Sequence, residues 1–290
     1  MDQNSPAVSK VTVPFILEQK LRGEKVTCLT AYDYSAARLV DEAGVEIILV
    51  GDSLAQAVLG YDSTVPVTVD EMLHHLKAVR RGVRRALLIV DLPYGAYHVS
   101  NEQAVANAIC FLKEGGAEAV KLEGGRKRAR VVRKLVEAQI PVMGHIGLTP
   151  QSIHALGGYR VQGKTLDSAT ELLADAEALE EAGAFAVVLE GIPRELAAII
   201  TRRLRIPTIG IGAGPDCDGQ VLVFHDLVGL SYLPSAKFVR SYANLREILH
   251  HALTNFHADV REGSYPDDRE SYHWTAAVRE QFEKETTRAG

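Results

Sequence analysis

Apolar residues occur along the chain in short uninterrupted runs, and longer amphipathic stretches separate one run from the next. A short run of this kind predicts a strand that is buried on both faces, as in a parallel sheet covered by helices. The predicted strands span residues 26–33, 47–53, 86–93, 119–124, 141–147, 186–192, 208–212 and, with a weaker pattern, 227–230.

Helix boundaries fall between these runs. Residues 68–71, 100–103 and 168–171 fit capping boxes, in which a hydroxyl and a carboxylate or amide satisfy free backbone donors at a helix N-terminus. An acidic residue, a small residue and a glycine occur in that order just before three of the apolar runs. This repetition indicates a chain built from similar helix–strand units.

Eight strands that alternate with helices favour a closed (β/α)8 TIM barrel, of the α/β class, over an open doubly wound sheet. An open sheet is the alternative, because the eighth strand has the weakest pattern. No GxGxxG motif follows the first strand, which argues against a dinucleotide-binding sheet. We expect a single barrel domain at residues 1–265 and a polar C-terminal extension at 266–290, helical or partly disordered.

The composition excludes several classes of function. The 290 residues are 47% hydrophobic and 24% charged, with a net charge of -5, so no nucleic-acid partner is expected. The three cysteines, Cys28, Cys110 and Cys217, are widely spaced, which favours a reducing compartment. No apolar run approaches the roughly 20 residues of a membrane helix, and no signal-peptide pattern begins the chain. We therefore expect a cytoplasmic protein without a membrane partner.

Carboxylates stand where the predicted strands end. Asp52, Asp91 and Glu123 close the second, third and fourth strands, and Glu190 closes the sixth. Carboxyl ends of neighbouring parallel strands meet at one mouth of a barrel, and Mg²⁺ prefers oxygen ligands there. The first three residues therefore predict a magnesium site. The alternative is that each carboxylate caps a helix or forms a salt bridge.

Four further roles follow from position. Lys121 shares a strand face with Glu123 and is expected to neutralise a substrate carboxylate or keto oxygen, unless it only forms an ion pair with Glu123. Glu190 lies across the barrel and suits a general base, or else a hydrogen-bonding residue behind the site. His145 ends the fifth strand and has a supporting or purely structural role. Ser53 is expected to hold a substrate carboxylate.

Together these residues predict a Mg²⁺-dependent barrel that acts on a small 2-oxo acid. The metal would stabilise an enolate, and Glu190 would create it. Long loops at 54–66, 144–163 and 212–219 follow strands and are expected to lie on the same face.

Several motifs around these residues resemble the ketopantoate hydroxymethyltransferase family. The resemblance runs in order over roughly residues 10 to 265 and is carried by LTAYDY (29–34), LVGDS (49–53), GYDST (60–64), DLP (91–93), KLEGG (121–125), GHIGLTPQ (144–151), GGYRVQG (157–163), GIGAG (210–214), DGQ (218–220) and HD (225–226).

The resemblance implies a magnesium-dependent TIM barrel, usually a homodecamer. It implies hydroxymethyl transfer from 5,10-methylenetetrahydrofolate to 3-methyl-2-oxobutanoate, giving 2-dehydropantoate for pantothenate and coenzyme A biosynthesis. It also implies site roles: a metal surrounded by Asp52, Asp91 and Glu123, an oxo acid bound by Asp52, Ser53, Asp91 and Lys121, and Glu190 as proton acceptor.

Two departures and two alternatives accompany this interpretation. Many relatives have glycine and a bulky apolar residue where this chain has Ala55 and Gln56, and residues 270–290 form a longer tail. One alternative is a magnesium-dependent carbon–carbon lyase of the isocitrate lyase and phosphoenolpyruvate mutase type, although its Cys-Gly-His pattern is missing here. The other is a non-catalytic barrel that serves as a scaffold.

Overall fold

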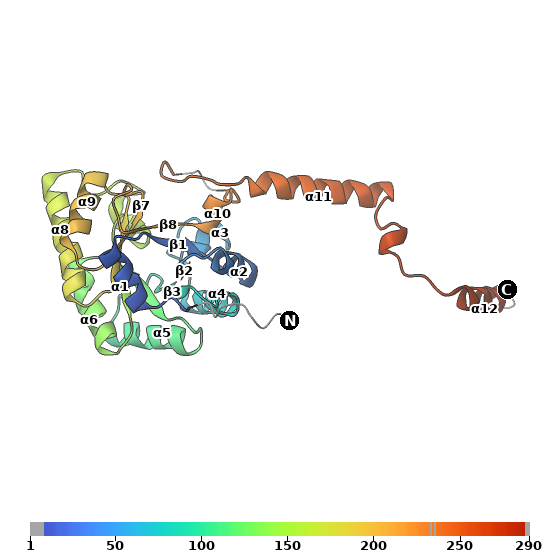
Figure 1. Cartoon of the computed structure of the whole chain (residues 1–290), viewed down its shortest axis with the longest axis horizontal. Coiled ribbons are helices and arrows are strands. Elements are labelled where there is room, and N and C mark those ends of the chain that lie inside the picture. Colours follow the sequence, from blue (N-terminus) through green and yellow to red (C-terminus); the bar gives the residue numbers. More distant parts are fainter. Residues whose placement is uncertain (1–8, 233, 235, 288–290) are drawn as a thin grey trace. The chain divides into compact units, whose positions relative to one another are not determined.

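Eight parallel strands close into a barrel in the order β1 to β8 (Figure 1). The structure is a computed structural model that describes residues 9–232, 234 and 236–287. The predicted TIM barrel is therefore confirmed. The strands are β1 (Val26–Thr30), β2 (Ile47–Val50), β3 (Leu87–Asp91), β4 (Ala119–Glu123), β5 (Val142–Gly147), β6 (Ala186–Glu190), β7 (Thr208–Ile211) and β8 (Gly219–Leu222).

The eighth strand was predicted in the wrong place. Residues 219–222 form β8, which pairs with β7 and closes the barrel on β1. Residue 227 instead ends the short helix α10 (Phe224–Leu227). The strand escaped prediction because its burial alternates, with Gln220 exposed, and so lacks an apolar run. No helix lies between β7 and β8 in this fully described stretch, so nothing local buries that outer face.

Helices cover most of the outside of the barrel, as the alternating pattern requires (Figure 1). Thr68 caps its helix with a full capping box, as predicted, whereas the helix expected from Ser168 already begins after Thr165. The helices that follow strands β1 to β6 are α2 (Tyr34–Glu42), α3 (Leu54–Ala57), α4 (Val69–Gly82), α5 (Asn101–Lys113), α6 (Ala129–Glu137), α7 (Ile153–Leu156), α8 (Leu166–Glu181) and α9 (Arg194–Arg203).

An apolar plug fills the barrel on the side away from the carboxyl ends of the strands. Alternate strand residues such as Leu87, Ile89 and Met143 form one buried cluster, which Val11 and Ile16 extend beside helix α1 (Val13–Arg22). Because side chains alternate along a strand, the next inward positions above this plug fall at the carboxyl ends of the strands. The polar residues of the site occupy these positions.

The contacts divide the chain after Tyr242 into a barrel unit and a C-terminal unit. This division lies earlier than the boundary at 265/266 expected from the sequence. The C-terminal unit contains α11 (Leu245–Glu262) and α12 (Ala276–Thr287), and no side chain of either helix is buried. Among the described residues, no helix is long and apolar enough to cross a membrane.

One buried carboxylate fastens the segment that leads into β3. The side chain of Asp41 at the end of α2 accepts hydrogen bonds from the backbone N–H groups of Arg84, Arg85 and Ala86, at 2.7–3.1 Å. Hydrogen bonds to an ionised acceptor are stronger than neutral ones, and each buried N–H needs a partner. Asp41 thereby fixes where β3 begins and, at its other end, where Asp91 lies.

Replacing Asp41 by asparagine removes the charge and places an amide nitrogen against backbone donors. We expect Asp41→Asn to lower the free energy of unfolding by about 2–3 kcal/mol. Urea-induced unfolding at fixed protein concentration measures this loss. The neighbouring Glu42→Gln, which affects only a surface pair with Arg38, is the control and should change stability by less than about 0.5 kcal/mol. Equal effects of the two changes would contradict the assigned role of Asp41.

Candidate active site

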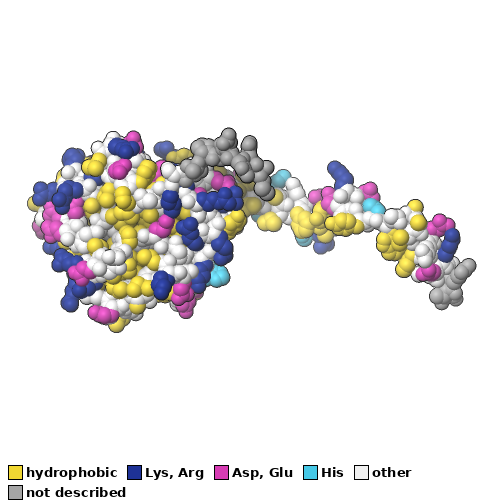
Figure 2. Space-filling view, turned by 60° about the horizontal axis from the view of Figure 1, so that its bottom comes forward, with side chains coloured by type: hydrophobic (Ala, Val, Ile, Leu, Met, Phe, Trp, Pro, Cys, Tyr) yellow, Lys and Arg dark blue, Asp and Glu magenta, His cyan; other side chains and the backbone are white. Residues whose placement is uncertain are grey.

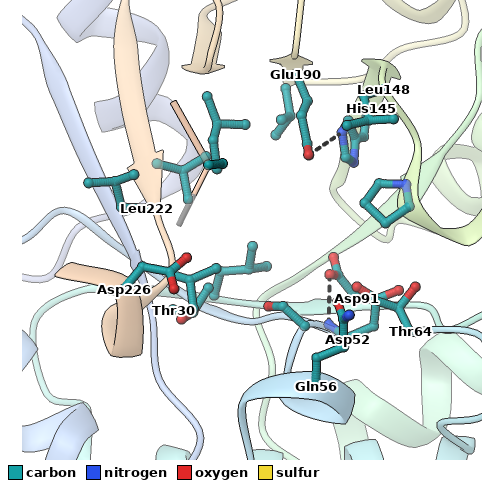
Figure 3. Close-up of a pocket in the computed structure, with 18 of the residues that line it drawn as sticks. Thr30, Asp52, Gln56, Thr64, Asp91, His145, Leu148, Glu190, Leu222 and Asp226 are labelled. Carbon is teal, nitrogen blue, oxygen red and sulfur yellow. Dashed lines mark hydrogen bonds and ion pairs between the residues drawn. The ribbon is translucent and has the colours of Figure 1, made fainter. Parts of the chain in front are cut away.

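A cavity of about 660 Å³ opens at the carboxyl ends of the strands (Figure 3). Its wall contains every residue that the sequence analysis selected: Asp52, Ser53, Asp91, Lys121, Glu123, His145 and Glu190. The structure therefore brings together groups that are up to 138 positions apart in the chain (190 minus 52). Whether each has its predicted role is a separate question, which the proposal below addresses.

Strand register places the central residues side by side. Asp91 in β3 lies opposite Lys121 in β4, and Glu123 in β4 lies opposite His145 in β5. Lys121 Nζ forms an ion pair with Asp91 Oδ1 at 2.9 Å, and both side chains are buried. Lys121 is therefore paired with Asp91, rather than with Glu123 as the structural alternative assumed.

His145 connects Lys121 to Glu190. Its Nδ1 lies 3.2 Å from Lys121 Nζ, and its Nε2 lies 3.2 Å from Glu190 Oε2 (Figure 3). Burial, together with the charge of Lys121, lowers the pKa of His145, which favours a neutral ring. An ammonium group can only donate, so Nδ1 accepts and the ring proton belongs on Nε2, the nitrogen that lies beside Glu190.

Gln151 is a site residue that the sequence analysis quoted in a motif but assigned no role. Its side-chain amide donates to Asp52 Oδ2 at 2.8 Å, and its backbone N–H donates to Glu123 Oε2 at 3.0 Å. Its amide oxygen accepts from Tyr97 at 2.6 Å. The signal available in the sequence was weak, since a glutamine after Thr149-Pro150 suggests a loop rather than a buried clamp.

Ser53 follows Asp52 and forms a hydrogen bond with the Tyr32 hydroxyl at 2.7 Å. The backbone N–H of Asp52 donates to Asp91 Oδ2 at 3.0 Å, which fixes the turn after β2 against β3. Gly51 makes this turn possible, because a Cβ there would lie 2.9 Å from the Ser53 hydroxyl oxygen.

The cavity contains more negative than positive charge. Asp52, Asp91, Glu123 and Glu190 line it, and Lys121 is the sole lysine or arginine among the described wall residues. Burial, followed by the neighbouring Asp91, raises the pKa of Asp52 to about 7. Burial and then Asp52 raise the pKa of Glu123 well above its ordinary value. For Lys121, burial lowers the pKa, but Asp91 and the other carboxylates outweigh it and the pKa rises.

This surplus of carboxylate oxygens fits a bound cation. Among the described residues, no three His, Cys, Asp or Glu side chains already stand as a ready-made metal cluster. Mg²⁺ does not require one, because it is held by one or two carboxylates and completes its shell with water and substrate oxygens. The donor chemistry of Asp52, Asp91 and Glu123 therefore fits Mg²⁺ better than a metal that needs a complete protein cage.

Two of the three predicted loops contribute to the cavity wall. Gln56 and Thr64 come from the first loop, and Leu148, Pro150 and Tyr159 come from the second. The Tyr159 hydroxyl donates to Gln56 Oε1 at 3.4 Å, so Gln56 connects the two segments. The third loop, 212–219, contributes no wall residue and leads directly into β8.

A closed parallel barrel with ionisable groups gathered at the carboxyl ends of its strands defines an α/β-barrel enzyme. The chain belongs to the ketopantoate hydroxymethyltransferase family, whose sequence model matches residues 10–268. The 3-methyl-2-oxobutanoate hydroxymethyltransferase of Koribacter versatilis is 62% identical over 265 residues, which cover 91% of this chain and 90% of that protein. The enzyme of the same name from Carboxydothermus hydrogenoformans is 53% identical over 275 residues, covering 95% of this chain and 100% of that protein.

Solved structures with a similar fold are far more distant in sequence. Phosphonopyruvate hydrolase in complex with oxalate and Mg²⁺ has a TM-score of 0.58 at 15% identity, covering 96% of each chain. The 2,3-dimethylmalate lyase, a member of the PEP mutase/isocitrate lyase superfamily, has a TM-score of 0.57 at 18% identity, covering 97% of this chain and 99% of that one. At these identities the likeness concerns the fold.

The raised pKa of Asp52 predicts opposite pH trends for the metal-free and the Mg²⁺-bound protein. Between pH 3.8 and about 7 the folded metal-free protein binds the extra proton, so the contribution of Asp52 to stability falls as pH rises through this window. Mg²⁺ needs the ionised carboxylate, so its affinity should fall by up to about tenfold per pH unit below about pH 7. Calorimetric titration with Mg²⁺ from pH 5.5 to 8 measures the second trend.

The variant Gln151→Leu tests the assignment of this titration to Asp52. The hydrogen bond from Gln151 lowers the pKa of Asp52, so its removal should move the midpoint of Mg²⁺ binding to higher pH. Gln281→Leu on the exposed face of α12 is the control and should leave the midpoint unchanged. An unshifted midpoint in Gln151→Leu would show that another group governs the pH dependence.

Proposed function

We propose that this chain transfers a hydroxymethyl group from 5,10-methylenetetrahydrofolate to 3-methyl-2-oxobutanoate, forming 2-dehydropantoate in pantothenate biosynthesis. Family membership supports the reaction, and one observation supports the mechanism. In a single cavity, Glu190 faces the side where Asp52 and Asp91 lie (Figure 3), and Lys121 is paired with Asp91 there. A carboxylate base and an oxyanion-stabilising side can thus act on one small substrate from two directions.

The polar side of the cavity is suited to the oxo acid head. Lys121 supplies a buried positive charge for the substrate carboxylate or keto oxygen, and the Ser53 hydroxyl supplies a hydrogen bond. Asp52, Asp91 and Glu123 would hold Mg²⁺, one or two directly and the rest through water. When bound, Mg²⁺ would supply positive charge that favours the enolate oxygen over the ketone.

Glu190 is proposed as the base that removes the proton from C3 of the oxo acid. The proton passes to a Glu190 oxygen, and the electron pair delocalises onto the keto oxygen, which gives the enolate. His145 Nε2 lies 3.2 Å from Glu190 Oε2, and its N–H attracts and orients the carboxylate. His145 is thus a positioning residue. Water adds to the folate methylene as one C–N bond breaks, which gives an N-hydroxymethyl group and one N–H. The enolate carbon then attacks this methylene carbon, the second C–N bond breaks, and the departing nitrogen takes up the proton held by Glu190.

The lyase alternative is disfavoured by where the cysteines lie. The reactions of that group often use a cysteine acid on a loop, but Cys110 lies in helix α5 and Cys217 is buried before β8. Neither belongs to the described wall of the cavity.

A non-catalytic scaffold would not need a buried lysine beside four carboxylates at the mouth of a barrel, because such burial costs free energy. Assembly as a decamer and a cytoplasmic location stay predictions.

The proposal requires that product forms only when both substrates and Mg²⁺ are present. We expect 2-dehydropantoate and tetrahydrofolate to appear in equal amounts by mass spectrometry, and neither to appear without the oxo acid. Incubation with 2,3-dimethylmalate is the matched control for the lyase alternative. Cleavage of that compound without hydroxymethyl transfer would replace the proposal by the alternative.

The base assignment is tested without folate. In deuterated water the wild-type protein with Mg²⁺ should exchange the C3 proton of 3-methyl-2-oxobutanoate, as proton NMR measures. Glu190→Gln should slow this exchange by about 100- to 10,000-fold, because general bases contribute that much, and should leave the affinity for Mg²⁺ within about threefold. Glu195→Gln, on the exposed surface of α9, is the control. Normal exchange in Glu190→Gln would remove Glu190 from the base role.

A further inference from the structure

The cavity extends beyond the groups that the reaction on the oxo acid uses. On the side of the cavity opposite Asp52 and Asp91, the wall is formed by Thr30, Leu222, Val223, Asp226 and Phe238, which we call the Asp226 lobe. Figure 3 shows Asp226, Thr30 and Leu222 across the open space from Asp52 and Asp91. A cavity of about 660 Å³ is large enough for a drug-sized ligand, and a small branched oxo acid fills a fraction of it. The lobe is therefore space for a second and larger molecule.

Asp226 is the one carboxylate among the described residues of this lobe. It lies in the short helix α10 after β8, is partly buried, and points its carboxylate into the cavity (Figure 3). Burial raises the pKa of Asp226, and a hydrogen bond with Ser231 and the nearby His225 offset this in part. A ligand that donates two hydrogen bonds to the carboxylate would satisfy a group that the fold has partly desolvated.

Apart from Thr30, the rest of the lobe is apolar and includes an aromatic ring. Phe238 packs against Gly212 so closely that a Cβ on the glycine would lie 2.7 Å from the ring. Gly212 also has a φ of +63°, which favours glycine there. The ring lies against the Gly212 backbone, and with Leu222 and Val223 it supplies apolar surface to the cavity that Asp226 also lines. A flat heterocycle can stack on such a wall while its edge reaches Asp226.

This combination selects a particular ligand chemistry. A 2-amino-4-oxo pyrimidine ring presents an amino group and an adjacent ring N–H on one edge, and these two donors match the two oxygens of a carboxylate. We propose that the Asp226 lobe binds the pteridine ring of the one-carbon donor, and that Asp226 accepts hydrogen bonds from its amino group and ring N–H. The inference rests on the proposed function, which makes a reduced folate the co-substrate. Guanine has the same edge, so the test includes it.

Three proteins are compared: wild type, Asp226→Asn and Asp216→Asn. Asp216 is exposed on the loop between β7 and β8 and pairs with Arg194, so it is the matched control. We expect Asp226→Asn to raise the KM for 5,10-methylenetetrahydrofolate and the Kd for tetrahydrofolate by about tenfold or more, since an amide cannot accept both hydrogen bonds. Its C3 proton exchange on the oxo acid should remain within about twofold of wild type. Retained exchange also shows that the variant folds.

A ligand change tests the same contact without relying on the variant. Tetrahydrofolate in which the 2-amino group is replaced by a methyl group should bind wild type about tenfold more weakly than tetrahydrofolate. It should bind Asp226→Asn as well as tetrahydrofolate does, because the contact is already lost. Guanosine monophosphate, which lacks the rest of the folate, should bind wild type at least about 100-fold more weakly than tetrahydrofolate.

The outcomes separate this inference from the proposed function. If wild type forms product but Asp226→Asn keeps the wild-type KM for the folate, the Asp226 lobe is not the pteridine site. The inference would also be overturned if the methyl analogue lost as much affinity relative to tetrahydrofolate in Asp226→Asn as in wild type. It would likewise be overturned if guanosine monophosphate bound wild type as tightly as tetrahydrofolate does. If wild type forms no product with both substrates, the proposed function fails first, whatever Asp226 does.

Discussion

One buried ammonium group sets the charge balance on which the whole cavity depends. Lys121 pairs with Asp91 and reaches His145, so its single charge connects β3, β4 and β5. Carboxylates as buried as these would otherwise take up protons, because a low-dielectric site penalises uncompensated charge. A protonated acid holds no cation and accepts no proton. Lys121 lowers the pKa of Asp52 and of Glu123, although burial and the neighbouring carboxylates still leave both values raised, and the cavity keeps more acidic than basic groups.

The barrel supplies the geometry that this balance needs. The apolar plug occupies the lower inward positions, so the polar side chains are gathered into one layer at the carboxyl ends of the strands. Direct neighbours in the register, Asp91 with Lys121 and Glu123 with His145, then interact without any loop having to fold over them. Loops provide Gln56, Tyr159 and Gln151, which adjust access and orientation. Rigid strands thus carry the charges, and the loops define the space around them.

The sequence was informative wherever a strand is buried on both faces, because such a strand has an uninterrupted apolar run. For this reason seven strands could be predicted, together with the carboxylates at the ends of four of them. β8 could not, because no helix covers it and its pattern alternates. Gln151 and Asp226 were also missed as site residues, because their significance depends on contacts across the barrel. No local pattern distinguishes a glutamine that clamps two acids, or an aspartate that points into a cavity, from ordinary surface residues.

The contacts of His145 with Lys121 and Glu190 have a consequence for the orientation of the Glu190 carboxylate. The other tautomer would point an N–H at the lysine ammonium and a bare lone pair at Glu190, and a turned-over ring would present C–H groups to both, so a single ring state fits these neighbours. Lys121 therefore acts as a lock on the imidazole, and the imidazole in turn fixes the direction of the Glu190 carboxylate. The charge of Lys121 on β4 thus determines the orientation of the Glu190 carboxylate on β6. In the proposed mechanism, stereochemical control of proton removal would then originate two strands away from Glu190.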